Sequence, residues 1–408
     1  MPEISRVVIV GASLAGLRAA GALRRAKFDG EITLIGAEPH LPYDRPPLSK
    51  QILVGKWAPE KAALSAPADF EKQRIDLKLG VRATALDTAG KAVVLEGGER
   101  VPYDAIIIAT GASPRKLRGT PEGLGGIHTL RTMEDALAIR AAMEQGARVA
   151  VVGAGFIGAE VAAAARERGL ETTVVEVFSQ PLERALGARI GAAAAKVHRD
   201  HGVDLRLGVG VAGFEGSGRV ERVVLENGDR IAADLVVVGI GVVPETGWLE
   251  DSGLTLRDGV VCDATLNAGV PGVYAVGDLC RWYNQLFEQE MRLEHWTNAV
   301  EQGMAAARNI VAGPGAARPY AAVPYVWSDQ YDLSIQTVGY TAGHDEVAVK
   351  HGSLETGELV ALYGRQGRLV AAVGFNMPRE LNDYRRLIAE RATMEAGLAH
   401  VIEDDEDE

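Results

Sequence analysis

The sequence predicts an α/β protein with two Rossmann-like dinucleotide-binding domains and a small α+β domain at the C-terminal end, and three observations predict this fold class. The apolar strands Val7-Val8-Ile9-Val10 and Val149-Ala150-Val151-Val152 each lead into a glycine-rich turn and an alanine-rich helix, 142 positions apart. In both units a second strand ends near an acid, Glu38 or Glu176. From about Pro324 the pattern changes to short strand-like stretches and one helix. Because such a turn brings backbone N–H groups up to a pyrophosphate, two of them predict two bound dinucleotides, a flavin and a nicotinamide coenzyme.

Composition and charge narrow the function classes. The chain has 408 residues, 47% of them hydrophobic and 24% charged, which is typical of a soluble globular protein of two to three domains. The net charge of −12 argues against nucleic-acid binding, and half of it comes from the acidic tail 403–408, which we expect to be disordered. No apolar run approaches the roughly 20 residues that cross a bilayer, and no leader precedes the first strand. We therefore expect a cytoplasmic protein without a membrane partner.

The first dinucleotide unit contains a long segment that is neither helix nor strand. Residues 38–49 include Pro39, Pro42, Pro46 and Pro47, and a stiff loop of this length in a compact domain is usually functional. The regular elements that we predict around it are a strand at 6–10, a helix at 14–25, a strand at 31–35, a strand-rich stretch at 76–100 and a buried strand at 104–109.

The second unit repeats this order and is inserted in the first. We predict a strand at 148–152, a helix at 157–168, a strand at 171–176, a meander at 203–230 and a strand at 234–241. The stretch Gly272-Val273-Tyr274-Ala275-Val276-Gly277-Asp278 then returns to the first unit. The predicted domains are an FAD-binding domain of residues 1–112 and 243–322, an NAD-binding domain of residues 113–242, a C-terminal domain of residues 323–402, and the tail 403–408.

The end of the chain is predicted as a helix at 297–311 followed by the small α+β domain. Strand-like stretches lie at 346–350, 358–363 and 369–375, and a turn at 364–367 joins the last two into a hairpin. We expect the helix at 379–391 to end the folded chain.

The two glycine turns supply the candidate dinucleotide sites. Ser13 stands where such turns usually carry their second glycine, and serine is small enough to serve and can hydrogen-bond phosphate. The predicted pyrophosphate-binding residues are Gly11, Ser13, Leu14, Ala15 and Gly16 in the first turn and Gly153, Gly155, Phe156, Ile157 and Gly158 in the second.

The acids after the second strands are candidates for binding ribose hydroxyls. Glu38 lies 22 residues after Gly16, and Glu176 lies 18 residues after Gly158. Each could instead be a solvated acid at the end of a strand, and Ala37 could replace Glu38 through its backbone. A carboxylate at position 176 repels a 2′-phosphate, so NADH is favoured over NADPH, although Arg184 is near enough to leave the choice open.

Four segments together resemble one known family. They are Leu41-Pro42-Tyr43-Asp44-Arg45-Pro46-Pro47-Leu48-Ser49-Lys50, Ala109-Thr110-Gly111, Tyr274-Ala275-Val276-Gly277-Asp278 and Trp327-Ser328-Asp329-Gln330. The chain resembles the oxygenase-coupled, NADH-dependent ferredoxin reductases, of the putidaredoxin reductase and biphenyl dioxygenase ferredoxin reductase type, over nearly its whole length. The resemblance implies a glutathione-reductase-like fold, FAD and NAD as cofactors, and a ferredoxin as partner.

The resemblance also assigns site residues. It implies that Lys50 lies beside the flavin N5, that Glu160 is its counter-ion, and that Asp278 hydrogen-bonds the ribityl chain. The further residues expected around the cofactors are Ala83, Arg131, Trp296, Arg45, Ala109, Thr110, Gly111, Gly277, Glu294, His295, Gly239, Ile240, Gly241 and Trp327. The helix after Trp296 would point its positive end at the flavin.

Several of these assignments have plainer alternatives. Lys50 could be a surface lysine, Glu160 an ordinary acid near a helix N-terminus, and Trp327 a packing residue rather than one at the flavin edge where electrons leave. Met304 stands where the family has a partner-binding arginine, so docking details do not carry over.

Cysteine usage distinguishes the function classes within this fold. The segment after Glu38 reads His40-Leu41-Pro42-Tyr43, where disulfide reductases of this fold carry a redox cysteine. The only cysteines, Cys262 and Cys280, have neither metal-site nor Cys-x-x-Cys spacing, so we expect free thiols and no metal. The flavin itself must then deliver the electrons.

We therefore expect an NADH:ferredoxin oxidoreductase, monomeric or weakly dimeric, whose [2Fe-2S] or similar ferredoxin feeds a haem or Rieske oxygenase. A rubredoxin reductase, and a flavoprotein like apoptosis-inducing factor whose redox state controls association, remain as alternatives. The candidates for a basic patch that attracts the ferredoxin are Arg281, Arg292, Arg308, Arg385 and Arg386.

Overall fold

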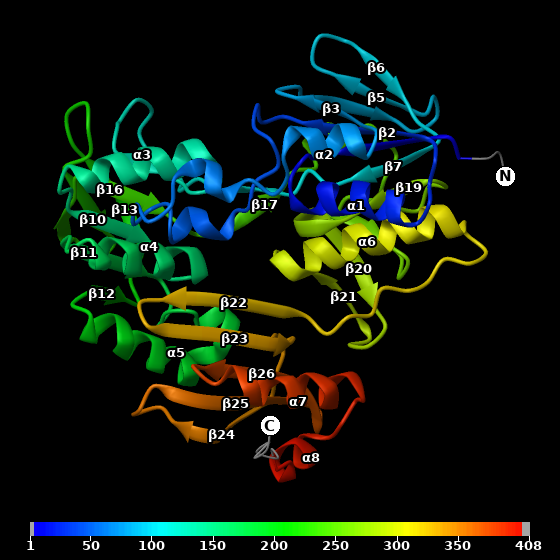
Figure 1. The fold of residues 1–408 in the computed structure, drawn as a ribbon. Helices are drawn as coiled ribbons and strands as arrows, with labels where there is room; N and C mark the ends of the chain where they lie inside the picture. The colour runs from blue at the N-terminus through cyan, green and yellow to red at the C-terminus, as the bar shows by residue number, and fades with distance from the viewer. Residues whose placement is uncertain (1–3, 402–408) are drawn as a thin grey trace. The chain divides into compact units, whose positions relative to one another are not determined.

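The computed structural model describes residues 4–401, which form two compact units (Figure 1). The first unit consists of residues 4–44, 62–113 and 243–322, and the second of residues 45–61, 114–242 and 323–401. The predicted tail 403–408 lies outside the described residues. The chain passes between the units near β8 (Ala112–Pro114), β17 (Val242–Pro244) and the 3-10 turn Pro59–Ala62.

The first unit is built on a five-stranded parallel sheet in the order β19-β7-β1-β2-β3. The strands are β1 (Arg6–Val10), β2 (Glu31–Gly36), β3 (Ile75–Leu79), β7 (Ala105–Ile108) and β19 (Val273–Ala275). Helices α1 (Leu14–Arg25) and α6 (Trp296–Ala312) pack on each other. A Cβ on Gly303 would lie 2.5 Å from the Ala15 carbonyl oxygen, so glycine there permits the close approach of the two helices.

Smaller elements complete the first unit. They are the meander β4 (Ala83–Asp87), β5 (Ala92–Leu95) and β6 (Arg100–Pro102), the three-stranded sheet of β18 (Val260–Cys262), β20 (Cys280–Asn284) and β21 (Gln289–Arg292), helix α2 (Pro67–Lys72), and the 3-10 turns Gly247–Leu249 and Gly277–Leu279.

The second unit contains another five-stranded parallel sheet, in the order β12-β11-β10-β16-β9. Its strands are β9 (Ile127–His128), β10 (Val149–Val152), β11 (Thr172–Glu176), β12 (Asp204–Leu207) and β16 (Leu235–Val238), and its helices are α3 (Met133–Glu144), α4 (Phe156–Glu167) and α5 (Glu183–Asp200). A separate antiparallel meander of β13 (Val211–Glu215), β14 (Arg222–Leu225) and β15 (Arg230–Ala232) lies between β12 and β16 in the sequence.

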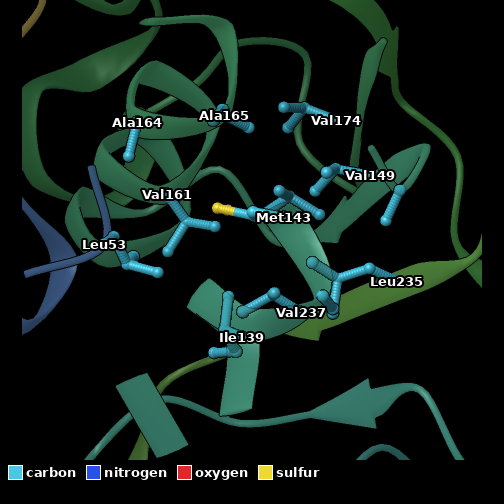
Figure 2. Packing of buried hydrophobic residues seen from close by; sticks show 14 of the residues in the cluster. Leu53, Ile139, Met143, Val149, Val161, Ala164, Ala165, Val174, Leu235 and Val237 are labelled. Carbon is cyan, nitrogen blue, oxygen red and sulfur yellow. The ribbon is translucent and has the colours of Figure 1, made fainter. Parts of the chain in front are cut away.

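One apolar core joins the sheet, α3 and α4 of this unit. Figure 2 shows Ile139 and Met143 from α3, Val161 from α4 and Val237 from β16 facing one another. Leu53, from the segment that follows the 3-10 turn Pro46–Ser49, is fully buried in the same cluster. Burial of this side chain therefore anchors the proline-rich segment and the neighbouring Lys50 to the second nucleotide-binding sheet.

The C-terminal part of the second unit is a five-stranded antiparallel sheet in the order β22-β23-β26-β25-β24. Its elements are β22 (Tyr325–Gln330), β23 (Leu333–Gly339), β24 (Glu346–Ser353), β25 (Glu358–Arg365), β26 (Arg368–Phe375), α7 (Pro378–Ala389) and α8 (Met394–Ala399). Strand β22 packs on α4, so the C-terminal sheet lies against the helix that follows the second glycine turn (Figure 1).

The predicted fold class is confirmed, and the predicted elements exist with small shifts at their ends. One expectation was wrong, because α7 does not end the folded chain: α8 follows it, with the Thr393 hydroxyl accepting the Ala396 N–H as an N-cap. The sequence analysis also did not identify α3, α5, β22 and β23. The boundaries of the three predicted domains stay a prediction.

Candidate active site

The first glycine turn forms a cradle in which no side chain fits. Gly11 has φ +117°, and a Cβ there would lie 2.1 Å from the Ala109 carbonyl oxygen at the end of β7. Ser13 is the N-cap of α1, but its side chain makes no capping hydrogen bond, and the first turn of the helix has no acid. The N-terminus of α1 thus suits an anion such as a pyrophosphate.

A second turn of the first unit lies against this cradle. Gly277 has φ +78°, and a Cβ there would lie 3.3 Å from the Ala15 side chain. His295 is the N-cap of α6, and among the described residues its buried Nδ1 has no hydrogen-bond partner. Burial lowers the pKa of His295 to about 4, so it is neutral at pH 7. An unpartnered buried nitrogen and a cradle closed to side chains fit the dinucleotide FAD.

Other predicted contacts of the first unit have protein partners. Trp296 Nε1 donates a hydrogen bond to Asp44 Oδ1 at 2.7 Å, which ties the start of α6 to the proline-rich segment. Glu38 Oε2 accepts a hydrogen bond from the Tyr43 hydroxyl at 2.5 Å. The remaining predicted residues of this unit are placed as follows: Leu14 and Gly16 in α1, Ala37 after β2, Ala83 at the start of β4, Thr110 and Gly111 after β7, Asp278 in the turn after Gly277, and Glu294 after β21.

The second glycine turn is more open than the first. Gly153 has φ +98°, and a Cβ there would lie 2.5 Å from the Gly239 carbonyl oxygen. No atom lies within 4 Å of the Cβ position of Gly155, which is the exposed N-cap of α4 and leaves its helix end without a side-chain cap. The N-terminus of α4 therefore also suits an anionic ligand such as a pyrophosphate.

Glu176 is tied to this turn. Its Oε2 accepts the Ala154 N–H at 2.6 Å and its Oε1 accepts the Phe178 N–H at 3.0 Å, and the side chain is buried. These bonds hold the carboxylate against the turn, where it can still accept a bond from a ribose hydroxyl. Phe178 and Ile157 are exposed, as is typical of a surface that a ligand covers. Arg184, on α5, is exposed.

The second unit also brings together Lys50 and Glu160, which the sequence separates by 110 positions. Lys50 Nζ lies 3.4 Å from Glu160 Oε1 and 3.1 Å from Asp329 Oδ2. Ser49 Oγ donates to Glu160 Oε2 at 2.5 Å, and Ser328 Oγ donates to Glu160 Oε1 at 2.6 Å. The expected pairing is thus present, while its place beside a flavin stays a prediction.

Burial and the neighbouring side chains shift the pKa of Glu160 in opposite directions. Burial raises the pKa of Glu160 above its ordinary value, while Lys50, Ser328 and Ser49 lower it. Lys50 is 12% exposed and lies 5.8 Å from the centre of the Trp327 ring. A cation held over an aromatic face and between two carboxylates is a positioned charge rather than a surface lysine.

The other predicted residues of the second unit are distributed along its loops. Arg45 donates through Nη1 to the Arg131 carbonyl, so these two are brought together. Trp327 lies in β22 and stacks on Tyr325 with 6.0 Å between ring centres. Gly158 lies in α4 with Phe156, and Gly239, Ile240 and Gly241 follow β16 at the same edge of the sheet as the glycine turn.

Three contributors to this site were missed by the sequence analysis. Ser49, Ser328 and Asp329 lie inside two of the four segments that carry the family resemblance, which was the available signal. In β22 the alternation of side chains places Trp327 and Asp329 toward Lys50, and Ser328 toward Glu160.

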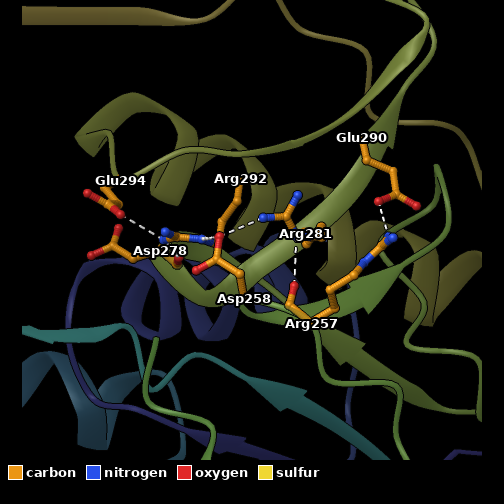
Figure 3. Close-up of polar contacts among 7 residues, drawn as sticks. All are labelled: Arg257, Asp258, Asp278, Arg281, Glu290, Arg292 and Glu294. Atoms are coloured by element: carbon orange, nitrogen blue, oxygen red, sulfur yellow. Dashed lines mark hydrogen bonds and ion pairs between the residues drawn. The ribbon is translucent and has the colours of Figure 1, made fainter. Parts of the chain in front are cut away.

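The expectation that Arg281 and Arg292 belong to a basic patch without neighbouring acids is wrong. Arg281 Nη2 lies 2.6 Å from Asp258 Oδ2, and Arg292 lies 3.2 Å from the same oxygen and 2.8 Å from Glu294 Oε1. Figure 3 shows these pairs together with the neighbouring pair of Arg257 and Glu290. Arg386 is paired with Glu390 at 3.4 Å, whereas Arg308 is exposed on α6. Local acids therefore neutralise much of the charge that was expected to attract the ferredoxin.

The two thiols are inaccessible. Cys262 and Cys280 are buried in β18 and β20, and burial raises the pKa of Cys280 well above its ordinary value. Within residues 4–401 no helix is long and apolar enough to cross a membrane, and no cluster of three or more His, Cys, Asp or Glu side chains is arranged to hold a metal ion.

Comparisons with known proteins agree with this geometry. The family model described as pyridine nucleotide-disulphide oxidoreductase matches residues 5–303, and the model described as reductase C-terminal matches residues 325–405. A ferredoxin--NAD(P)(+) reductase of Sphingomonas sp is 37% identical over 96% of this chain and 94% of that protein. The putidaredoxin reductase of Pseudomonas putida is 36% identical over 96% of this chain and 93% of that protein.

A solved structure supports the same assignment. The reductase chain in the covalent putidaredoxin reductase–putidaredoxin complex superposes with a TM-score of 0.91 at 35% identity, over 95% of this chain and 93% of that one. Proteins of this family use FAD and NAD(P)H. The chain therefore belongs to the pyridine nucleotide-disulphide oxidoreductase family, and within it to the ferredoxin reductases that carry the reductase C-terminal domain.

Proposed function

We propose that this protein transfers electrons from NADH through FAD to a small [2Fe-2S] or similar ferredoxin that feeds a haem or Rieske oxygenase. The FAD, when bound, supplies the step from a two-electron donor to a one-electron acceptor. The observation that carries the proposal is the pair of anion-binding glycine turns in a chain whose described thiols are both buried. With no accessible thiol among residues 4–401, a disulfide relay has no candidate residue.

The residues of this chain have defined tasks in that transfer. The turns at Gly11 and Gly153 bind the two pyrophosphates through backbone N–H groups. Glu176, held by Ala154 and Phe178, faces the adenosine ribose and disfavours a 2′-phosphate, which supports NADH over NADPH. Lys50, with its charge fixed by Glu160, supplies a positive charge at the flavin.

We infer a ferredoxin as the electron-accepting partner from the names of related proteins. One relative is the ferredoxin reductase component of an anthranilate 1,2-dioxygenase system of Burkholderia cepacia, and the structural neighbour was solved bound to putidaredoxin. We propose a cytoplasmic reductase, monomeric or weakly dimeric, with the exposed Arg308 as the remaining candidate for attracting an acidic ferredoxin.

The test is reduction of cytochrome c by NADH with and without an added [2Fe-2S] ferredoxin. We expect a rate that depends on the ferredoxin concentration and saturates. Ferricyanide, which needs no docking surface, serves as the control acceptor. Reduction of disulfides or peroxide without any ferredoxin, or a rate independent of ferredoxin, would refute the proposal.

A further inference from the structure

A line of buried polar side chains continues beyond Glu160 through the second unit. Ser328 Oγ donates to Glu160 Oε1 at 2.6 Å, and Gln330 Nε2 donates to Ser328 Oγ at 3.2 Å. Gln330 Oε1 lies 3.0 Å from His198 Nε2, and His198 Nδ1 lies 3.0 Å from the Tyr331 hydroxyl. The line thus connects α4, β22 and α5, and the proposed reaction uses none of His198, Gln330 and Tyr331.

Counting protons fixes the direction of every bond in this line. When Glu160 is ionised, as its contact with Lys50 favours, its carboxylate can only accept, so the one proton of the Ser328 hydroxyl points to Glu160. The Ser328 oxygen is then an acceptor, which requires Gln330 to present its NH₂ group. Gln330 therefore presents its carbonyl oxygen to His198, and His198 must carry its proton on Nε2.

The outer end of the line obeys the same rule. A neutral imidazole with its proton on Nε2 accepts at Nδ1, so the Tyr331 hydroxyl donates to His198. All four donors are consequently directed toward the carboxylate. Hydrogen bonds aligned in one direction polarise one another and favour the anion at their end, most strongly where water is excluded, and Ser328, Gln330 and His198 are all buried.

The charged groups around the line are consistent with a neutral histidine. Burial lowers the pKa of His198 to about 4, and the neighbouring His201, which stacks on Tyr331, acts in the same direction. Arg166 of α4 donates to the His201 carbonyl, which places a further positive charge at the outer end. At the inner end Glu160 faces Lys50 and Ser49, and Asp329 lies on the other side of Lys50.

We propose that His198 is a positioning residue that acts through Gln330 and Ser328 on Glu160. It selects the amide orientation that turns the single Ser328 proton toward the carboxylate, and so keeps Glu160 the anionic partner of Lys50. Without the His198 Nε2 donor, the Gln330 amide is free to turn over, and Ser328 then donates to the Gln330 carbonyl instead of to Glu160. Only the expected effect on flavin reduction rests on the proposed function, in which Lys50 supplies a positive charge at the flavin.

The test uses the FAD-loaded protein labelled with ¹³C at the glutamate side-chain carboxyls and with ¹⁵N in the histidine rings. NMR titration follows the Glu160 carboxyl, assigned with Glu160→Gln, and the ring nitrogens of His198. In the unmodified protein we expect His198 to be neutral with its proton on Nε2. In His198→Leu we expect the apparent pKa of Glu160 to rise by about one unit, a tenfold change in its ionisation constant. Adding Gln330→Leu to His198→Leu removes the competing carbonyl, so the double variant is expected to cancel most of that rise.

Two variants serve as comparisons. His198→Gln keeps an N–H donor near the position of Nε2, so the titration of Glu160 is expected to return close to that of the unmodified protein. His351→Leu is the matched control, because His351 Nε2 lies 2.9 Å from the Tyr384 hydroxyl in a histidine–tyrosine pair of the same unit outside the line. It is expected to leave the pKa of Glu160 unchanged.

Two results would overturn the inference: a His198 proton on Nδ1 in the unmodified protein, which needs no variant to fold, or an unchanged Glu160 titration in His198→Leu. The same experiments distinguish a failure of this inference from a failure of the proposed function. A shifted Glu160 titration in a protein that reduces no ferredoxin leaves the inference standing, and an unshifted titration in an active ferredoxin reductase leaves the function standing.

Discussion

Replacing Lys50 by methionine tests the buried ion pair. Lys50 Nζ and Glu160 Oε1 are 3.4 Å apart, Glu160 is buried and Lys50 is only 12% exposed, so their attraction is about 5 kcal/mol at an effective dielectric constant of about 20. Removing one partner of a buried pair typically costs about 3–5 kcal/mol. We therefore expect Lys50→Met to raise the pKa of Glu160 further, because the buried carboxylate loses the cation that favours its charged form.

The functional consequence is measured by stopped-flow reduction of the bound flavin with NADH. Loss of the cation should slow reduction at least about tenfold and shift the flavin absorption spectrum. Because the protein has two units and a cofactor, a single unfolding free energy is not the right measure, whereas a double-mutant cycle with Glu160→Gln isolates the pair. We expect the effects of the two changes to be strongly non-additive.

Lys56→Met is the matched control from the same segment. Lys56 Nζ lies 2.5 Å from Glu167 Oε1, but both side chains are largely exposed, and such pairs contribute about 0–1 kcal/mol. Its flavin spectrum and reduction rate should equal those of the unmodified protein. If Lys50→Met behaved like Lys56→Met, or if the double variant showed simple additivity, the assignment of Lys50 and Glu160 as a functional pair would be wrong.

Three further predictions concern the cofactors and the partner. The purified protein should be yellow, and trichloroacetic acid should release its FAD into the supernatant; colour retained in the pellet would contradict non-covalent binding. The kcat/KM for NADH should exceed that for NADPH by roughly 10- to 100-fold, from about 1–3 kcal/mol at Glu176, and Glu176→Gln should narrow the gap; equal use of both coenzymes by the unmodified protein would exclude this role. Ferredoxin-dependent cytochrome c reduction should fall several-fold from low to high ionic strength while ferricyanide reduction changes little. Arg308→Glu should weaken that salt dependence, with Arg386→Glu as the comparison because Glu390 already pairs with Arg386; identical salt responses for both acceptors would argue against electrostatic attraction.

The sequence by itself determined the two nucleotide-binding units. The strands and helices at 6–25 and 148–168 are local patterns of apolar periodicity, and the glycines at positions 11 and 153 are required by positive φ and by carbonyl oxygens that leave no room for a Cβ. In each unit the strand, the glycine turn and the helix lie within about 20 residues of one another. They can therefore be predicted without knowledge of the rest of the chain. The family motifs then pointed to Lys50, Glu160 and Trp327.

Only the tertiary structure decided which side chains face these residues. Ser49 and Ser328 reach Glu160 from 111 and 168 positions away, and Asp258 reaches Arg281 and Arg292 from a neighbouring loop. Helix α3 was missed although Thr132 and Asp135 form a capping box that marks its start in the sequence. Hydrogen bonds and ion pairs between distant segments depend on packing over the whole domain, and no local periodicity encodes them.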